Sequence, residues 1–427
     1  WMFGLKEGFD VVIGNPPYVS HDKIKEKKEI KRQYLAYEPF ADIYCYFIEC
    51  AINLQNKQGL LCYITSNSYL RSDYGRPIRK LLKEKNDLLE IINIEDFQVF
   101  ESAIVNVAVL ITVKHKSNRK PNCQVVNSPF DGNESFEEFV QREGFDYPQN
   151  VFTDKPWSLL KPKLFLIQKK MESNNKTLEQ LGTKIRLGLA TGHNDAFIIN
   201  EEQKKEFCKL QATNVEIIKP ILRGRDISRF SYKLPNQYIL LTKNGIDIKK
   251  DYPYIYKHLD SFGESFKKRG AQGQHWTNLR ACSFFDDFKK EKIVWIELTD
   301  TGRFALCNDE VYLLNSAYFL LPSQGTNAKF LLGILNSKVI QFYLSIIAET
   351  SGMGTSRWIN NFVKEFPIPL TSHEIQTSII QIVDQILAAK QKTPNADMSA
   401  LERQIDQMVY KLYDLTPDEI AIVERVR

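Results

Sequence analysis

The chain has few of the residues that build metal sites, disulfide frameworks or membrane spans. Its seven cysteines form no Cys-x-x-Cys pair, and its six histidines are scattered without the spacing of metal ligands. These features favour reduced core thiols over a disulfide or zinc framework, so no metal site is expected. No run approaches the roughly 18 apolar residues of a membrane-spanning helix, and no signal-peptide pattern opens the sequence. We therefore expect a cytoplasmic protein without a membrane partner.

Charge of one sign is not in large excess either. The net charge is +5 and the pI is about 8.6, a mildly basic balance that permits a polyanionic partner but does not require one. With 427 residues, of which 43% are hydrophobic, the chain is long enough for two or three domains.

The most informative pattern that is present is a rigid turn behind a short apolar strand. Residues 9–14 read Phe-Asp-Val-Val-Ile-Gly, the composition of a buried strand that ends at glycine. Pro16 and Pro17 then fix two φ angles and remove two backbone donors, so the carbonyls of the turn are not all used by neighbouring N–H groups. Asn15 adds an amide and Tyr18 an aromatic face. These carbonyls, the amide and the ring are suited to bind a flat heterocycle through its exocyclic amino group. Asn-Pro is, however, also a common start of an ordinary turn.

The string from Phe9 to Tyr18 resembles the signature of the amino-methyltransferases, S-adenosylmethionine-dependent enzymes that methylate adenine N6, cytosine N4 or a glutamine amide. The resemblance implies that the Asn15 side chain and the Pro16 carbonyl accept hydrogen bonds from the target amine, near the methyl donor. It also implies that Tyr18 stacks on the base and that Pro17 belongs to the same catalytic turn. Catalysis then rests on orientation and electrostatics: the amine attacks the methyl group directly, and no cysteine nucleophile is needed.

The segments after this turn alternate between strand and helix patterns. Apolar residues at positions 43, 47, 48 and 51 have helical spacing, and the turn Asn56–Gly59 is expected to end that helix with glycine as its C-cap. Strands are expected at residues 60–65, 88–93 and 105–113, with a helix around residues 78–82. The alternation indicates α/β layers. Together with the resemblance, it implies the C-terminal half of a Rossmann-like methyltransferase domain.

Three further strings look like the adenine methyltransferases: Asp-x-Tyr-x-x-Phe at residues 42–47, the strand end Thr65–Leu70, and residues 97–103. In the Taq-type adenine-N6 enzymes, an aromatic residue at the position that matches Phe100 contacts the flipped base. Phe100 is therefore a second candidate for base stacking beside Tyr18. Plain hydrophobic core is the other interpretation of Phe100, and Asp42 equally fits a surface helix cap.

The cofactor half of such a domain is missing from the expected place. The family binds S-adenosylmethionine through a glycine-rich turn and an acidic residue on the first strand of the sheet, and in the adenine-specific class this motif precedes Asn-Pro-Pro-Tyr. Only fourteen residues precede Asn15, and the glycines at 182 and 188 do not follow a suitable strand. We therefore expect a fragment that keeps the target-base half of the domain and lacks most of the S-adenosylmethionine site.

From residue 178 to about 370 the pattern changes to short strands and turns, with basic and aromatic residues interleaved in the loops. Strands are expected at residues 185–190, 196–199, 238–241 and 292–296. Polar and basic side chains in Gly-containing loops can contact phosphates and read base edges, although each charge alone equally fits a solvated surface. The candidate DNA-binding residues are Arg223, Arg225, Lys267, Lys268, Arg269, Gln272, Gln274, His275 and Arg357.

This segment resembles the target-recognition domain of type IIG restriction-modification enzymes and the related type I specificity subunits. The resemblance is carried by an ordered series of strings at residues 188–197, 220–227, 292–295, 316–319, 331–337 and 366–369. Because base-contacting residues vary with the DNA target within that family, none is carried over individually.

The sequence thus predicts four parts: a partial methyltransferase domain at 1–115, a connector at 116–177, a mixed α+β DNA target-recognition domain at 178–370 and C-terminal helices at 371–427. The last part carries two apolar stripes of helical spacing. Capping boxes are expected at Thr371 with Glu374 and at Thr416 with Glu419.

The function predicted from the sequence is methylation of adenine N6 in duplex DNA, as part of a bacterial restriction-modification system of the type IIG kind. We expect a monomer whose partners are double-stranded DNA and S-adenosylmethionine. Two alternatives stay open: a catalytically inactive DNA-recognition fragment, and an RNA or protein-glutamine N-methyltransferase.

Overall fold

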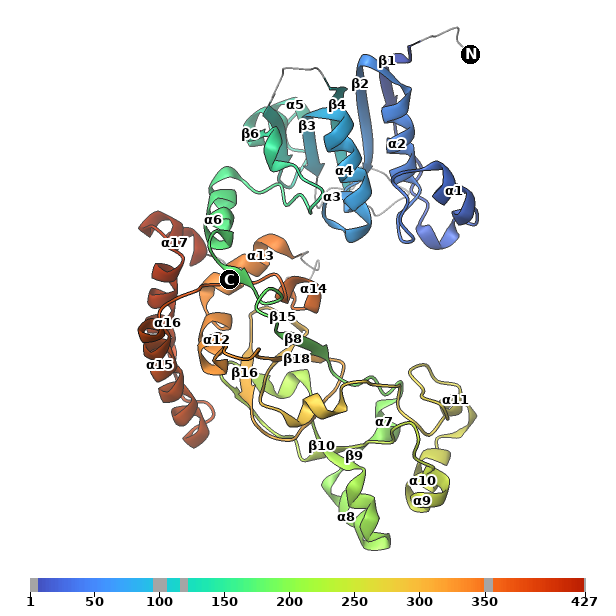
Figure 1. Ribbon diagram of the computed structural model, residues 1–427, viewed down its shortest axis with the longest axis vertical. Helices are drawn as coiled ribbons and strands as arrows, with labels where there is room; N and C mark the ends of the chain where they lie inside the picture. The colour runs from blue at the N-terminus through green and yellow to red at the C-terminus, as the bar shows by residue number, and fades with distance from the viewer. Residues whose placement is uncertain (1–6, 95–105, 116–121, 349–355, 426–427) are drawn as a thin grey trace. The chain divides into compact units, whose positions relative to one another are not determined.

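A computed structural model describes residues 7–94, 106–115, 122–348 and 356–425. The chain divides into two compact units, Trp1–Leu166 and Ile167–Arg427, and each is described by itself below (Figure 1). The boundary falls inside helix α6 (Pro162–Glu172). The finer division at residues 115, 177 and 370 stays a prediction.

The first unit is built on a six-stranded sheet of order β1-β2-β4-β3-β5-β6. Its strands are β1 (Phe9–Gly14), β2 (Gln55–Ser66), β3 (Asn86–Ile94), β4 (Val107–Lys114), β5 (Asn122–Asn127) and β6 (Phe145–Pro148). The pairs β1/β2 and β3/β5 are parallel, and the other pairs are antiparallel. Strands β1, β2, β3 and β5 therefore run in one direction and end at the same edge of the sheet.

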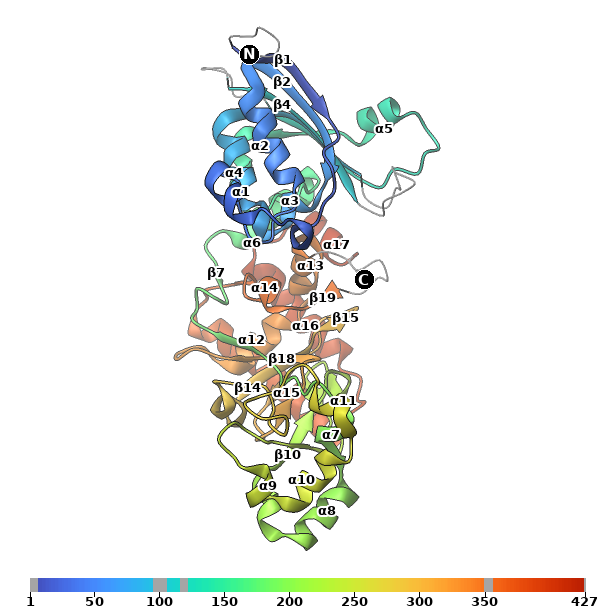
Figure 2. The same cartoon turned by 90° about the vertical axis from the view of Figure 1, so that its right-hand side faces the viewer.

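Helices cover both faces of this sheet (Figure 2). Its helices are α1 (Lys27–Gln33), α2 (Tyr44–Leu54), α3 (Ser68–Arg71), α4 (Arg76–Lys85) and α5 (Phe136–Glu143). Because side chains alternate along a strand, Ile91 joins the larger core that includes α2 and α4. Its neighbour Ile92 joins a smaller core with Phe139 of α5. The expected α/β layers are confirmed.

The buried face of α2 differs from the predicted stripe. Phe47 is 40% exposed, whereas Tyr44, Ile48 and Ala51 are buried. The expected glycine C-cap is also wrong: α2 ends at Gln55, and Gly59 lies in β2. The register between β1 and β2 shifts in this region, so the polar turn residues form an irregularity in the strand.

The second unit contains two four-stranded sheets, β17-β10-β13-β9 and β16-β14-β18-β8, around one large core. Their strands are β8 (Lys184–Leu187), β9 (Ile198–Asn200), β10 (Ile218–Leu222), β13 (Gln237–Leu240), β14 (Lys292–Ile296), β16 (Phe304–Cys307), β17 (Tyr312–Leu313) and β18 (Ala317–Leu321). Two-stranded pairs join β11 (Ile227–Ser228) to β12 (Ser231–Tyr232), β15 (Leu298–Thr299) to β19 (Ser356–Arg357), and β20 (Pro367–Ile368) to β7 (Lys176–Thr177). The predicted mixture of strands and helices is confirmed.

The helices of this unit include α7 (Asn194–Phe197), α8 (Glu201–Leu210), α9 (Ile248–Asp251), α10 (Pro253–Asp260), α11 (Gly263–Lys267) and α14 (Asn360–Val363). One strand prediction fails in part, because residues 196 and 197 close the short helix α7. The His193 side chain caps α7 by accepting a hydrogen bond from the Ala196 N–H at 3.3 Å.

Helical packing dominates the C-terminal part. Helices α12 (Ala328–Leu335), α13 (Lys338–Ile347), α15 (His373–Lys392), α16 (Ser399–Leu412) and α17 (Pro417–Val423) form this layer. A side chain at Gly333 of α12 would place its Cβ 2.8 Å from Ile379 of α15, so glycine permits the close approach of the two helices. The capping box at Thr416 is confirmed, whereas Ser372, not Thr371, caps α15.

Among the described residues, no single helix has the length and apolar character needed to span a membrane. Helices α12 and α13, which are bent by 64° relative to each other, reach this length and apolar character only when they are taken together.

A partly buried histidine is expected to make the second unit sensitive to acid. His258 packs against Phe207 and Phe262, and its Nε2 lies 3.0 Å from the Ala196 carbonyl oxygen. Burial lowers the pKa of His258 below its ordinary 6.5. As the pH falls below 6.5, the unfolded chain takes up a proton that the folded unit does not, so stability decreases.

We therefore expect denaturant unfolding of the second unit to require less urea as the pH falls below 6.5, and His258→Gln to reduce this dependence. The exposed His373 provides the matched control variant, His373→Gln. An identical pH dependence in the wild-type chain and His258→Gln would contradict the assignment.

Candidate active site and nucleic-acid interface

The Asn-Pro-Pro-Tyr turn begins where β1 ends, at the edge of the sheet shared by four strand ends. Gly14 pairs with Tyr63 of β2, and a Cβ at Gly14 would lie 3.0 Å from the Tyr63 ring. Asn15 is exposed and Pro16 is buried. The Tyr18 hydroxyl donates a hydrogen bond to Asn15 Oδ1 at 3.1 Å, and burial raises the pKa of Tyr18. The turn thus presents one amide and one phenol ring together.

The chain that follows this turn is tied to the start of α2. The Asp42 carboxylate accepts a hydrogen bond from the His21 N–H at 2.9 Å, and the Ile43 N–H donates to the Val19 carbonyl at 3.1 Å. Asp42 therefore anchors the segment after Tyr18, a role that neither sequence interpretation of Asp42 included.

A row of asparagines links the other strand ends at the same edge. The amide of Asn67, just after β2, donates to Asn93 Oδ1 at 2.8 Å, and the amide of Asn93 in β3 donates to Asn127 Oδ1 at 2.6 Å. Asn127 at the end of β5 donates in turn to the Leu159 carbonyl at 3.1 Å. The sequence signal was present, since β3 and β5 each carry an asparagine directly after two β-branched residues, but these asparagines were not predicted as a group.

Three cysteines of this unit, two buried and one partly buried, are not activated nucleophiles. Burial raises the pKa of Cys45 to about 12, and it also raises the pKa of Cys62 and Cys123. Thiols with raised pKa values are protonated at neutral pH and therefore react slowly. The second stacking candidate, Phe100, lies outside the described residues, and so does the string at 97–103.

In the second unit, the candidates between 267 and 275 differ in their surroundings. Lys267 forms ion pairs with Asp260 and Glu264, both at 2.9 Å. The amide of Gln272 donates to the carbonyls of residues 267 and 269 at 2.8 and 2.7 Å. Lys268, Gln274 and His275 are exposed. The exposed side chains are thus the ones available to a partner.

The Arg269 side chain makes all its hydrogen bonds to backbone carbonyls of the second unit. Its guanidinium donates to the carbonyls of Thr191 at 3.0 Å, Trp276 at 2.6 Å and Asn278 at 3.0 Å. It also lies 4.4 Å from the ring centre of Phe266. Burial lowers the pKa of Arg269 to about 10, so the side chain remains charged at neutral pH. This geometry favours a structural role over a DNA contact.

We expect Arg269→Met to lower the stability of the second unit by about 2–3 kcal/mol, because three carbonyls lose a charged donor. The exposed neighbour provides the control, Lys268→Met, which should change stability by less than about 0.5 kcal/mol. Urea unfolding of both variants is the measurement. Equal stabilities would show that the Arg269 hydrogen bonds contribute little.

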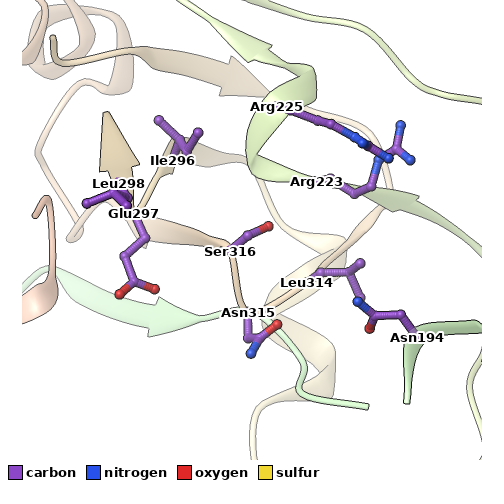
Figure 3. A pocket seen from close by; sticks show the side chains of 9 residues that line it. All are labelled: Asn194, Arg223, Arg225, Ile296, Glu297, Leu298, Leu314, Asn315 and Ser316. Atoms are coloured by element: carbon purple, nitrogen blue, oxygen red, sulfur yellow. The ribbon is translucent and has the colours of Figure 1, made fainter. Parts of the chain in front are cut away.

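Three other candidates meet around one pocket of about 630 Å³ in the second unit. Arg223 and Arg225 line it, and Arg357 pairs at 3.1 Å with Glu297, another lining residue. The complete lining is Asn194, Arg223, Arg225, Ile296, Glu297, Leu298, Leu314, Asn315 and Ser316. Figure 3 shows Glu297 and Leu298 toward one end and the two arginines and Asn194 toward the other.

Arg223 and Arg225 differ although they are two residues apart. Arg223 makes a forked ion pair with Asp226 at 2.8 and 3.0 Å, and also donates to Gln237. Arg225 is exposed, and within the described part of the chain its side chain has no hydrogen bond or ion pair. The structure therefore separates a clamped arginine from an available one.

No group of three His, Cys, Asp or Glu side chains among the described residues could hold a metal ion.

Comparison with known proteins finds a match in each unit. Residues 1–100 match the Eco57I restriction-modification methylase family, and residues 219–368 match the TaqI-like C-terminal specificity domain. These two segments are therefore similar to parts of restriction-modification proteins. The resemblance predicted from the sequence is confirmed.

Individual relatives agree with this assignment. The type II methyltransferase M.BstVI of Geobacillus stearothermophilus is 21% identical over 97% of this chain and 75% of its own length. The type II restriction enzyme and methyltransferase RM.Eco57I of Escherichia coli is 23% identical over 97% of this chain, which spans 47% of that protein. The solved structure of the type IIL restriction-modification enzyme MmeI in complex with DNA is 13% identical, with a TM-score of 0.59 over 97% of this chain and 56% of that chain. This last likeness shows the fold alone.

Proposed function

We propose that the protein transfers a methyl group from S-adenosylmethionine to adenine N6 in duplex DNA, within a restriction-modification system of the type IIG kind. The observation that carries the proposal is the turn behind β1, where the exposed Asn15 amide and the Tyr18 ring are joined by a 3.1 Å hydrogen bond. The family matches and the relatives named type II methyltransferases support it.

The residues of the turn act on the target amine. Asn15 Oδ1 has a second lone pair beside the one that Tyr18 uses, and together with the Pro16 carbonyl it accepts the two N–H groups of the amine. This orients the nitrogen and keeps it electron-rich toward the methyl group. Pro17 keeps the turn rigid, and Tyr18 stacks on the base. The buried thiols take no part, since their raised pKa values keep them protonated.

When bound, S-adenosylmethionine supplies an electrophilic methyl group. The described residues fit the amine side of this reaction, and Asn15 would hold the target amine toward the methyl group. Among residues 7–94, no strand leads into a glycine-rich turn with an acidic residue of the kind that holds a nucleotide ribose. No residue is therefore assigned to the adenosine or methionine parts of the cofactor.

Access to adenine N6 requires the base to leave the stack, which costs a few kcal/mol. Contacts from the specificity domain to the duplex offset this cost. Among the candidates described, Arg225 and Lys268 are exposed and make no ion pair, and Arg357, which pairs with Glu297, is a third cation on this unit. Adenine as the target base is part of the proposal, because the same turn serves cytosine N4 equally well.

Calorimetric titration with S-adenosylmethionine, with and without mixed-sequence duplex DNA, is the first test. Micromolar binding should be followed by methyl transfer to DNA, with N6-methyladenine identified by mass spectrometry of the nucleosides. Methylation of cytosine N4, of RNA or of a protein glutamine instead would contradict the proposal.

A second candidate function is DNA recognition without methyl transfer by this chain. It is favoured by the lack of an identified cofactor turn in residues 7–94. Salt-sensitive DNA binding without any binding of S-adenosylmethionine would support this function over the first.

A further inference from the structure

The pocket of the specificity domain contains two polar side chains without intramolecular partners. Within the described part of the chain, neither the Arg225 guanidinium nor the Asn315 amide makes a side-chain hydrogen bond, and both residues are exposed. The other polar lining residues are engaged: Arg223 with Asp226, Asn194 with Thr191, Ser316 with the Gly224 N–H, and Glu297 with Arg357.

The turn that carries Arg225 is rigid. Arg223 and Asp226 clamp it from both sides through a forked pair, and Asp226 also accepts the Arg223 N–H at 3.0 Å. The Gly224 N–H donates to Ser316 Oγ at 3.2 Å. A Cβ at Gly224 would lie 2.7 Å from the Ser316 carbonyl oxygen and 2.8 Å from Ile296 Cγ1. The turn therefore packs directly on the strand residues of the pocket, which fixes the base of the Arg225 side chain.

The chemistry of the pocket suits a base edge better than a phosphate. Glu297 brings a carboxylate into the same lining, and three apolar side chains complete it: Ile296, Leu298 and Leu314. The Glu297 carboxylate pairs with Arg357 through Oε1, and its Oε2 can accept a hydrogen bond from cytosine N4, whereas an arginine fork matches guanine O6 and N7. The lining thus offers donors and an acceptor of the kinds that a G·C pair needs.

We propose that Arg225 reads a guanine in the major groove of the recognised DNA site, with Arg223 holding the turn in place. This inference rests on the proposed function, because it requires the second unit to bind duplex DNA. To the proposed function it adds the identity of one recognised base, guanine, and of the residue that contacts it, Arg225.

The test begins with selection of binding sites for the wild-type chain from a randomised duplex pool. Each selected guanine is then replaced in turn by 7-deazaguanine, which lacks N7. One position should weaken wild-type binding by roughly 2- to 12-fold, about half the free energy of a bidentate pair, because 7-deazaguanine keeps O6. Arg225→Ala should tolerate any base at that position and should be insensitive to 7-deazaguanine there, while it keeps its preferences elsewhere.

Two further variants separate base reading from charge. Arg225→Lys keeps the charge but loses the fork, so it should also lose the guanine preference. Arg403→Ala, on the exposed face of α16 and outside the pocket lining, removes one positive charge and should keep every preference.

Each contrary outcome has a distinct meaning. If Arg225→Ala weakens all sequences equally and the salt slope falls by about one, Arg225 contacts a phosphate and the inference is wrong. If the selected site and its 7-deazaguanine profile do not change, Arg225 is a solvated surface residue and the inference is again wrong. If the wild-type chain does not bind duplex DNA, the proposed function fails together with the inference.

Discussion

Asn15→Ala should lower the rate of methyl transfer to DNA by roughly 100- to 1,000-fold or more in the complete protein, while DNA affinity changes little. Losses of this size follow when one preorganised hydrogen-bonding group is removed from a catalytic site. In the structure, Asn15 is the exposed amide of the turn behind β1, and its Oδ1 already accepts the Tyr18 hydroxyl. Alanine removes that acceptor while the rigidity from Pro16 and Pro17 remains. Single-turnover methylation and DNA titration of the same preparations measure both effects.

Two controls sharpen this experiment. Asn53→Ala removes an exposed asparagine from α2 of the same unit and should leave the rate unchanged. Tyr18→Phe keeps the ring but removes the 3.1 Å hydrogen bond to Asn15, so the rate should fall by roughly tenfold or less, the value of one hydrogen bond. Full activity in Asn15→Ala would contradict the role given to Asn15. Loss of DNA binding in that variant would show that the turn is structural.

The regular elements were largely predictable because their signals are local. Periodicity placed β3, β4 and β14 within about two residues of their observed bounds, and the Thr416 capping box is present as expected. The Asn-Pro-Pro-Tyr turn after β1 was predictable for the same reason, since two prolines and a glycine determine the backbone within a few residues.

Predictions failed where a tertiary contact decides the outcome. Phe47 fits the apolar spacing of α2 yet is exposed, because the packing of α2 on the sheet buries Tyr44 and Ile48 instead. The hydrogen bonds of Arg269, a predicted DNA-binding residue, were not foreseen, because one of its acceptors, the Thr191 carbonyl, lies 78 residues away. The periodicity of a sequence does not predict contacts over such a distance. For the same reason it did not predict the hydrogen bond from Asn93 to Asn127, which joins two strands.

Arg79 should be the residue whose replacement most destabilises the first unit. It is 1% exposed, and its guanidinium donates to the carbonyls of Tyr69 at 2.5 Å, Ser72 at 2.8 Å and Asp154 at 3.1 Å. Burial lowers the pKa of Arg79 to about 10, which leaves it protonated at neutral pH. Arg79→Met fills the same space, but three carbonyls lose their charged donor and, among the described residues, only that of Ser72 keeps another, the Gly75 N–H, so a loss of about 3 kcal/mol is expected.

The same helix supplies the matched control for this variant. The Arg76 side chain is 71% exposed, and it forms a surface ion pair with Asp154 at 2.8 Å, so Arg76→Met should cost less than about 1 kcal/mol. Hydrogen exchange of residues 55–94 in increasing urea should separate the two variants. Two of the carbonyls that Arg79 holds, those of Tyr69 and Ser72, belong to the segment just after Asn67, at the strand edge that also carries Asn15. Arg79→Met should therefore lower the methylation rate as well as stability, whereas equal protection of the two variants would mean that water replaces the guanidinium at little cost.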